Sequence, residues 1–280
     1  MNDVIVLVTG ASRGVGRGIA LALLAEGATV HVTGRTRSEE EAVRHPQGSG
    51  SLQGLAAEAA GLPGKLVLHP CDHAQEAETA AVVRSILEAH GRIDILVNNA
   101  WPGYENMVEG TDFTWPRPFW EQPMWRWQAM MDVAVRTVFV ASRLAAPAMV
   151  ARQRGLIVNI SFWAGELYEG NAIYGVSKAA ANKLAFDFAH DLRPHGVAAV
   201  ALYPGVVRTE AVLRAAEFID LSNSESPQFS GRVIAGLWQD PNLMQKSGKV
   251  HVVASLAREY GILDIDGRQP VPITADAFRR

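Results

Sequence analysis

A glycine-rich turn close to the N-terminus is the feature that most limits how this chain can fold. The apolar run Val4–Val8 leads into the turn Thr9-Gly10-Ala-Ser-Arg-Gly14-Val-Gly16, and residues 19–24 follow with helical character. Such a unit lets the backbone approach a phosphate closely, and the helix N-terminus supplies free N–H groups and a positive dipole end. The sequence therefore predicts a dinucleotide site here, although its Gly-x3-Gly-x-Gly spacing differs from the commoner Gly-x-Gly-x-x-Gly.

Strand-like and helix-like segments alternate along the rest of the chain. Apolar runs of strand length fall at residues 29–33, 65–69, 93–97, 155–160, 196–202 and 249–253, and segments of helical character fall at 77–89, 127–152 and 172–193. This alternation predicts parallel strands joined by helices. We expect one α/β domain over residues 1–280, with a Rossmann-type doubly wound parallel sheet of about seven strands and helices on both faces.

Composition restricts the partners of the protein and its compartment. The formal net charge of −3 and the pI near 6.2 give no basic excess for binding nucleic acid or an anionic membrane. A single cysteine, Cys71, excludes an internal disulfide framework and a multi-cysteine zinc site. The N-terminus enters a strand with no room for a secretory leader, and no apolar run reaches the ~18 residues of a membrane span. We expect a cytoplasmic protein with no metal site.

Three polar side chains between residues 161 and 178 offer acid–base chemistry. Ser161 ends the apolar run 155–160, and Tyr174 and Lys178 follow in the opening turns of a predicted helix. Residues four apart share one helix face, so the ammonium should lower the pKa of the phenol toward working pH. Ser161, at the strand tip, is placed to hold a substrate oxygen. A tyrosine and a lysine at this spacing also occur without function on many helices.

Two arginines bear on the choice of dinucleotide. The second strand ends at Gly34-Arg35, and Arg13 lies inside the glycine turn. NAD-binding domains usually carry an acidic residue about 20 residues beyond the glycines, whereas an arginine suits the 2′-phosphate of NADP. Arg13 and Arg35 together favour NADPH over NADH. The alternative is that either arginine is a solvated surface charge.

Two irregular stretches are expected to border the substrate site. Residues 101–127, the Trp-rich loop, hold five of the seven tryptophans and four prolines, which exclude one regular helix. The loop follows a central strand, where open α/β sheets bind ligands, so it is a candidate aromatic wall for the substrate. It can equally be a stiff loop that packs its rings on its own body or on another subunit. Residues 210–231, polar in part, are predicted to form a mobile flap over the cleft.

These motifs, in this order, resemble the short-chain dehydrogenase/reductase family over nearly the whole chain. Residues 119–123, 174–180 and 247–250 resemble a narrower branch, that of the mammalian dehydrogenase/reductase family member one. The matches to the family at large are Thr9-Gly10-x3-Gly14-x-Gly16, Asp72, Asn98-Asn99-Ala100, Ser161, Tyr174-x3-Lys178 and Pro204-Gly205-x3-Thr209.

The resemblance implies a role for each matched residue. Tyr174 would be the general acid or base, Ser161 would orient a substrate carbonyl, and Lys178 would lower the tyrosine pKa and bind the nicotinamide ribose. The implied cofactor-binding residues are Gly10, Ser12, Arg13, Gly14, Val15 and Gly16 around the pyrophosphate, Arg35 and Asp72 at the adenosine end, Asn98, Asn99 and Ala100 beside the cofactor, Pro204, Gly205, Val207 and Thr209 along the carboxamide, and Tyr174 and Lys178.

The implied activity is a reversible, NADPH-dependent reduction of a ketone or aldehyde of moderate size and apolar character. Two alternatives are a cofactor-binding protein with little catalysis and a reductase of an enoyl or imine group. The resemblance also implies a homo-oligomer, a dimer or a tetramer, that associates through the helices near residues 127–152 and 172–193.

Two positions depart from the family pattern. Trp101 stands where the family has a glycine after Asn98-Asn99-Ala100, which should narrow or reshape the pocket beside the cofactor. Ala134 stands where many members place an asparagine that serves as a fourth catalytic residue. A backbone carbonyl that holds a water is the part of this role that alanine retains. The sequence therefore does not define the route by which protons reach Tyr174.

Overall fold

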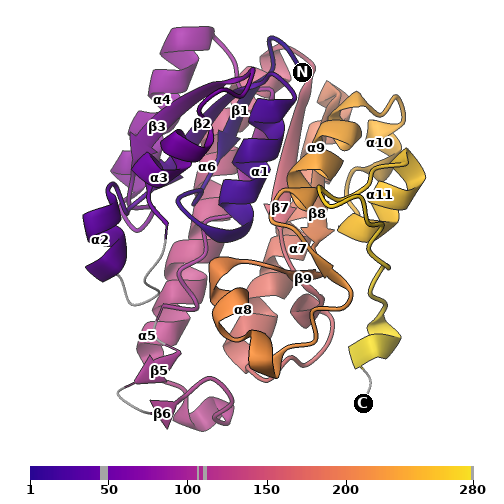
Figure 1. Ribbon diagram of the computed structural model, residues 1–280. Helices are drawn as coiled ribbons and strands as arrows, with labels where there is room; N and C mark the ends of the chain where they lie inside the picture. The colour runs from indigo at the N-terminus through magenta and orange to yellow at the C-terminus, as the bar shows by residue number, and fades with distance from the viewer. Residues whose placement is uncertain (45–49, 106, 110–111, 279–280) are drawn as a thin grey trace.

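The computed structural model describes residues 1–44, 50–105, 107–109 and 112–278. Its centre is a sheet of seven parallel strands in the order β11-β8-β7-β4-β1-β2-β3 (Figure 1), which confirms the predicted doubly wound class. The predicted strand ends lie within two residues of the observed ones, and those of β7 match them. The strands are β1 (Ile5–Val8), β2 (Thr29–Gly34), β3 (Lys65–Pro70), β4 (Ile95–Asn98), β7 (Gly155–Ile160), β8 (Val197–Tyr203) and β11 (Val250–Val252).

Both faces of the sheet are covered, which explains why its central strands are largely apolar. Successive residues of a strand point to opposite faces. In β1, Val6 and Val8 enter one core cluster, whereas Ile5 and Leu7 enter another on the opposite face. β4, β7 and β8 likewise contribute to both cores, and full burial of a side chain of this size stabilises the fold by about 1.5–3 kcal/mol.

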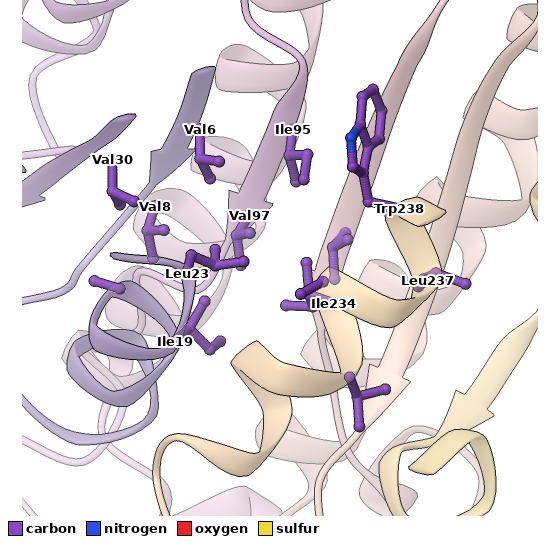
Figure 2. Packing of buried hydrophobic residues seen from close by; sticks show 14 of the residues in the cluster. Val6, Val8, Ile19, Leu23, Val30, Ile95, Val97, Ile234, Leu237 and Trp238 are labelled. Atoms are coloured by element: carbon purple, nitrogen blue, oxygen red, sulfur yellow. The ribbon is translucent and has the colours of Figure 1, made fainter. Parts of the chain in front are cut away.

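The first face is covered by α1 (Gly14–Ala25), α9 (Phe229–Gln239) and α11 (Val253–Tyr260). Figure 2 shows Ile19 and Leu23 of α1 beside Ile234 of α9, over the valines of β1. Glycine permits the close approach of these helices, because a Cβ on Gly231 would lie 2.7 Å from the Ala22 Cβ. The glycine turn is thus tied firmly to the core through the helix that follows it.

The second face is covered by α4 (Glu76–His90), α6 (Arg136–Ala151) and α7 (Ala172–Leu192). Small residues on the buried sides, such as Ala141 and Ala145 of α6 and Ala189 of α7, fit these helices against the sheet. Short elements outside the Trp-rich loop and the predicted flap are α2 (Glu39–Arg44), α3 (Leu52–Glu58), α10 (Leu243–Lys246), η3 (Trp163–Gly165), η4 (Arg193–His195) and η6 (Ala275–Phe278).

The Trp-rich loop is built of short elements and contains no long helix. It holds β5 (Val108–Glu109), β6 (Asp112–Phe113), η1 (Phe119–Glu121) and α5 (Met124–Trp127). The helix predicted over residues 127–152 is not uniform, because η2 (Gln128–Val135) is π-helical before α6 begins. π-Helical turns are rare and often lie at functional sites.

The predicted flap also contains regular structure. It begins with α8 (Glu210–Arg214) and η5 (Ala216–Phe218), and β10 (Ser224–Glu225) then pairs with β9 (Val206–Val207). The first three residues of α9, 229–231, complete the predicted range. Figure 1 places α8 and the Trp-rich loop at the same end of the molecule, below the sheet. These two segments border the cleft described next.

One helical stretch, Met124–Ala151, is long and apolar enough to cross a membrane by length and mean hydropathy alone. The sequence had predicted no such span on the stricter criterion of an uninterrupted apolar run. In the structure, Ala141, Ala145 and Met149 of this stretch are buried in the core on the second face of the sheet. That packing accounts for part of its apolar character, since 39% of the apolar window is buried.

Candidate active site

Two adjoining cavities lie at the carboxyl ends of the central strands. The first, which we call the glycine-turn cavity, has a volume of about 390 Å³ and follows β1, β2 and β3. The second, the tyrosine cavity, has a volume of about 310 Å³ and follows β4, β7 and β8. Both are lined by Asn99, Ala100, Trp101 and Tyr104. They form one cleft where the strand order reverses between β1 and β4, the usual ligand position in this class of sheet.

The structure brings the predicted site residues together along this cleft. All of them line one or both cavities except Gly16, which is buried behind the turn. Gly16 has no room for a side chain, because a Cβ there would lie 2.3 Å from Asn99 Nδ2. Asn99 Nδ2 donates to the Gly10 carbonyl oxygen at 2.8 Å. The absence of a side chain at Gly16 therefore allows Asn99 to brace the turn.

The glycine turn has the geometry of an anion site. Gly10 and Gly14 have φ values of +67° and +59°, a region that favours glycine. A Cβ on Gly10 would also lie 2.6 Å from the Ala100 Cα. The Gly14 backbone N–H donates to the Glu210 carboxylate at 3.0 Å, so this helix terminus already binds a negative oxygen. The pyrophosphate of a dinucleotide fits the same donor.

The two predicted arginines line the glycine-turn cavity. Arg13 donates to Thr36 Oγ1 at 3.2 Å, and burial lowers the pKa of its guanidinium. Arg35 forms an ion pair with Glu105, and its side chain is 43% exposed. Asp72 lies in the same cavity, where its carboxylate accepts from the Ala74 N–H at 3.0 Å. Both guanidinium groups thus lie along one wall of the cleft, and Arg35 also has the exposure of a surface charge.

The predicted acid–base residues converge from β7 and α7 on the tyrosine cavity. Asn171 caps α7 by accepting from the Tyr174 N–H at 3.0 Å, which fixes the first turn of the helix. Ser161 Oγ donates to the Lys178 carbonyl oxygen at 3.2 Å, and Lys178 Nζ donates to the Ile160 carbonyl oxygen at 3.4 Å. Strand tip and helix are therefore held together at the point where their side chains face the cavity.

The charge states of the pair differ from those expected from its spacing. Burial lowers the pKa of Lys178 from 10.5 to about 7. Burial also raises the pKa of Tyr174 well above its ordinary value, and Tyr104 and Glu169 raise it further. The tyrosine pKa is thus raised, opposite to the direction expected from the spacing, because burial outweighs the effect of the Lys178 ammonium. The lysine Nζ lies 4.1 Å from the centroid of the Trp101 ring, and loss of solvent dominates both groups.

The sequence analysis missed Tyr104, which belongs to the Trp-rich loop. Its hydroxyl donates to the Tyr174 hydroxyl at 3.1 Å. Its ring lies 6.1 Å from Trp101 and 5.4 Å from Trp115, measured between centroids. A tyrosine three residues after Trp101, at the end of a central strand, was the available signal. The prolines and tryptophans around it obscured that signal.

The Trp-rich loop divides between the two roles considered for it. Trp101 and Tyr104 line the cleft, and the Trp115 ring lies 5.3 Å from that of Tyr174. Phe119 and Trp120, in contrast, are 69% and 71% exposed and lie outside both cavities. The first half of the loop therefore forms an aromatic wall, and η1 carries its rings on the surface.

A buried arginine holds this wall in place. Arg126 is fully buried and donates to the Thr114 carbonyl oxygen at 3.1 Å and to Thr114 Oγ1 at 2.8 Å. Its guanidinium also lies 4.7 Å from the Trp125 ring centroid. A buried charge persists only where such hydrogen bonds and ring contacts replace its hydration. Trp115, which follows Thr114, is thereby fixed against Tyr174.

The fold and this constellation define a dinucleotide-dependent oxidoreductase, and comparison with known proteins gives the family. Residues 4–218 match the family described as short chain dehydrogenase, and the chain belongs to that family. It is 40% identical over 285 residues to mouse (Mus musculus) dehydrogenase/reductase SDR family member 1, a match that covers 96% of this chain and 85% of the relative. The human (Homo sapiens) protein of the same name is 39% identical over 282 residues with the same coverage.

Solved structures agree with this assignment. A metagenomic short-chain oxidoreductase in complex with NADP has a TM-score of 0.68 at 30% identity, covering 90% of this chain and 96% of that one. A 7α-hydroxysteroid dehydrogenase complexed with NADH and 7-oxo glycochenodeoxycholic acid has a TM-score of 0.72 at 25% identity, covering 96% and 95%. The protein is accordingly an NAD(P)-dependent dehydrogenase/reductase of the branch of family member 1, and it acts on small molecules.

Proposed function

We propose that this protein reduces a ketone or aldehyde to an alcohol with NADPH, and that it catalyses the reverse oxidation. The observation that carries the proposal is the convergence of Ser161, Tyr174 and Lys178 on the tyrosine cavity. That cavity opens into the glycine-turn cavity through shared lining residues, so a dinucleotide bound at the turn can extend to the three side chains.

The bound cofactor supplies the hydride, and the protein provides orientation and a proton. The Ser161 hydroxyl rotates about its C–O bond, so it can donate to a carbonyl oxygen that enters the cavity. The raised pKa of Tyr174 keeps its phenol protonated at neutral pH, which is the state that a general acid requires. Lys178, in its ammonium form, favours the negative charge that develops when Tyr174 releases its proton.

The preference for NADPH is supported by Arg13 and Arg35 on one wall of the glycine-turn cavity. A 2′-phosphate carries the negative charge that two guanidinium groups recognise through charge-assisted hydrogen bonds. In the structure Arg35 pairs with Glu105, so a phosphate has to replace that carboxylate. The preference therefore depends on the exchange of one anionic partner of Arg35 for another.

The substrate class follows from the walls of the tyrosine cavity. Val135, Val138, Phe162 and Val212 line it together with Trp101, and polar groups gather around Ser161 and Tyr174. A cavity of about 310 Å³ with this lining suits a carbonyl compound of moderate size and apolar character. Trp101, in place of the glycine of the family pattern, forms one of the apolar walls.

The direct test is turnover of a carbonyl panel with NADPH and NADH side by side. Tyr174→Phe removes the acid but retains the ring, so we expect kcat to fall at least about 100-fold while calorimetric NADPH affinity changes little. Unchanged turnover in this variant would sink the mechanism. Equal affinity for NADH and NADPH would remove the role assigned to the two arginines.

Ala134 favours one alternative, a cofactor-binding protein with little catalysis. Its methyl group lines the tyrosine cavity at the position where many relatives carry an asparagine for the proton relay. Tight NADPH binding without turnover across the whole panel would support that alternative. Reduction of an enoyl or imine group is distinguished by product analysis, because the bond that gains hydrogen differs.

A further inference from the structure

Catalytic turnover requires a proton route to Tyr174 that the side chains of the predicted residues do not provide. Tyr174 is 6% exposed, so its hydroxyl has little direct access to water. Ala134, 3% exposed, has no side-chain group that carries a proton. Lys178 Nζ donates to the Ile160 carbonyl oxygen and lies over Trp101, so it is directed away from a hydrogen bond with the phenol.

Tyr104 is the side chain that joins this phenol to the open part of the cleft. Its hydroxyl donates to the Tyr174 hydroxyl at 3.1 Å. The residue is 39% exposed and lines both cavities, whereas Tyr174 lines only the inner one. Tyr104 therefore borders the wider glycine-turn cavity, and its hydroxyl contacts the acid.

The position of Tyr104 is well defined by its neighbours. Its ring lies between Trp101 and Trp115, at 6.1 Å and 5.4 Å between centroids. A phenylalanine would satisfy the same ring contacts. Packing alone therefore gives no reason for the presence of the hydroxyl. Burial raises the pKa of this phenol, so it stays protonated and able to donate.

We propose that Tyr104 is a second catalytic tyrosine, which passes protons between water in the cleft beside the bound cofactor and the Tyr174 hydroxyl. The inference rests on the proposed carbonyl reduction and assigns a residue to it that the family motifs did not contain. Tyr104 takes a direct part in the chemistry, because its hydroxyl contacts the Tyr174 oxygen atom, which gains and loses the proton.

The proton steps balance in both directions. In reduction the carbonyl carbon gains the hydride, the Tyr174 O–H bond breaks, and its proton passes to the substrate oxygen. The Tyr104 O–H bond then breaks to restore the Tyr174 phenol, and a proton from water restores Tyr104. One hydride and one proton are consumed for each alcohol formed. In oxidation the same bonds break and form in the opposite order.

Charged groups around the two phenols determine how the relay responds to pH. Lys178 Nζ, from α7, lies 5.7 Å from the centroid of the Tyr174 ring, and Glu169 acts on Tyr174 from the segment that precedes α7. Glu105, the neighbour of Tyr104 in the chain, is paired with Arg35. An ammonium favours phenolate and a carboxylate opposes it, so removal of one phenol must change the pH profile of kcat.

The test compares Tyr104→Phe with a matched control, Tyr168→Phe. Tyr168 is 73% exposed and lies outside both cavities, so the same loss of a hydroxyl there should leave kcat unchanged. We expect Tyr104→Phe to lower kcat about 10-fold to 100-fold, to shift its pH profile and to enlarge the solvent deuterium effect. NADPH affinity by calorimetry should stay within about twofold. Tyr104→His, which retains a group that gives and accepts protons, should recover part of kcat.

The outcomes separate the relay from a packing role and from failure of the proposed function. A Tyr104→Phe protein with wild-type kcat and pH profile would overturn the relay. So would a loss confined to KM, NADPH affinity or melting temperature, because those readouts report packing. If the wild type reduces no carbonyl compound, or if Tyr174→Phe stays active, the proposed function fails together with the relay. If the wild type reduces a carbonyl compound and Tyr174→Phe is inactive, but Tyr104→Phe keeps the wild-type kcat and pH profile, the relay alone is refuted.

Discussion

At the scale of single residues, the active site is a place where buried charge is retained at a cost. Lys178 is 8% exposed and has no carboxylate within ion-pair distance among the described residues. Burial of an ammonium without such a partner disfavours the charged form, which is why the pKa falls to about 7. The same loss of solvent keeps the Tyr174 phenol protonated. At pH 7 the Tyr174 phenol is thus protonated and Lys178 is about half protonated.

Replacement of Lys178 should therefore stabilise the protein while it disables the enzyme. Burial lowers the pKa of Lys178 from 10.5 to about 7 in the folded protein, so between these pH values the unfolded chain binds more protons. The buried lysine therefore destabilises the fold fully below pH 7 and not at all above about pH 10.5. We expect Lys178→Met to raise the free energy of unfolding at pH 7 by on the order of 2 kcal/mol. Urea titrations at several pH values measure this, and a variant no more stable than wild type would contradict it.

At the scale of elements, the Trp-rich loop and the flap each place a carboxylate where a phosphate group is expected. Glu105 pairs with Arg35, and Glu210, at the start of α8, accepts from the Gly14 N–H. The flap element α8 is thereby joined to the N-terminus of α1. A dinucleotide that binds through its pyrophosphate has to displace the Glu210 carboxylate from this donor.

Neutralisation of Glu210 should therefore strengthen cofactor binding. Glu210→Gln removes a negative charge from the phosphate position, so we expect the Kd for NADPH to fall several-fold, with a smaller change for a ligand that lacks the pyrophosphate. Isothermal titration calorimetry measures both. Glu217→Gln, an exposed position in the same flap, is the control for a general charge effect. Weaker binding in Glu210→Gln would show that the carboxylate supports the cofactor instead of competing with it.

The sequence predicted those elements whose pattern is set locally. β1, β4 and β7 are continuous apolar runs, and Gly10 and Gly14 are at positions with positive φ, so both signals lie in the chain itself. The π-helical stretch 128–135 could not be separated from α6, because its composition is equally helical. Tyr104 and the pKa directions were missed because they depend on which side chains the folded chain brings together.

At the scale of the whole molecule, a cluster of three histidines links β2, β3 and α4 near one edge of the sheet. His31 of β2 lies between His69 of β3 and His90 of α4, with ring nitrogens 2.9 Å and 3.0 Å apart. Each contact needs one unprotonated nitrogen as the acceptor, so the three rings cannot all carry a charge while both contacts are kept. Burial lowers the pKa of His31 from 6.5 to about 4, and the two neighbouring histidines lower it further.

This cluster should make the fold sensitive to mild acid. Below pH 6.5 the unfolded chain binds a proton that folded His31 does not, so its contribution to stability is lost progressively as the pH falls from 6.5 toward about 4. His73, whose pKa burial also lowers to about 4, acts in the same direction. We expect His31→Phe to lose less stability than wild type between about pH 7.5 and pH 5 in urea titrations. Parallel losses in the two proteins would exclude His31 as a source.

Trp101 gives the cleft a further property, an optical one. The indole that replaces a glycine at the end of β4 lies against Lys178 and lines both cavities. Reduced nicotinamide absorbs light in the range where tryptophan emits, so a cofactor in this cleft should receive excitation from that ring. The tryptophan fluorescence of the enzyme should therefore be lower with the reduced cofactor bound than with the oxidised one.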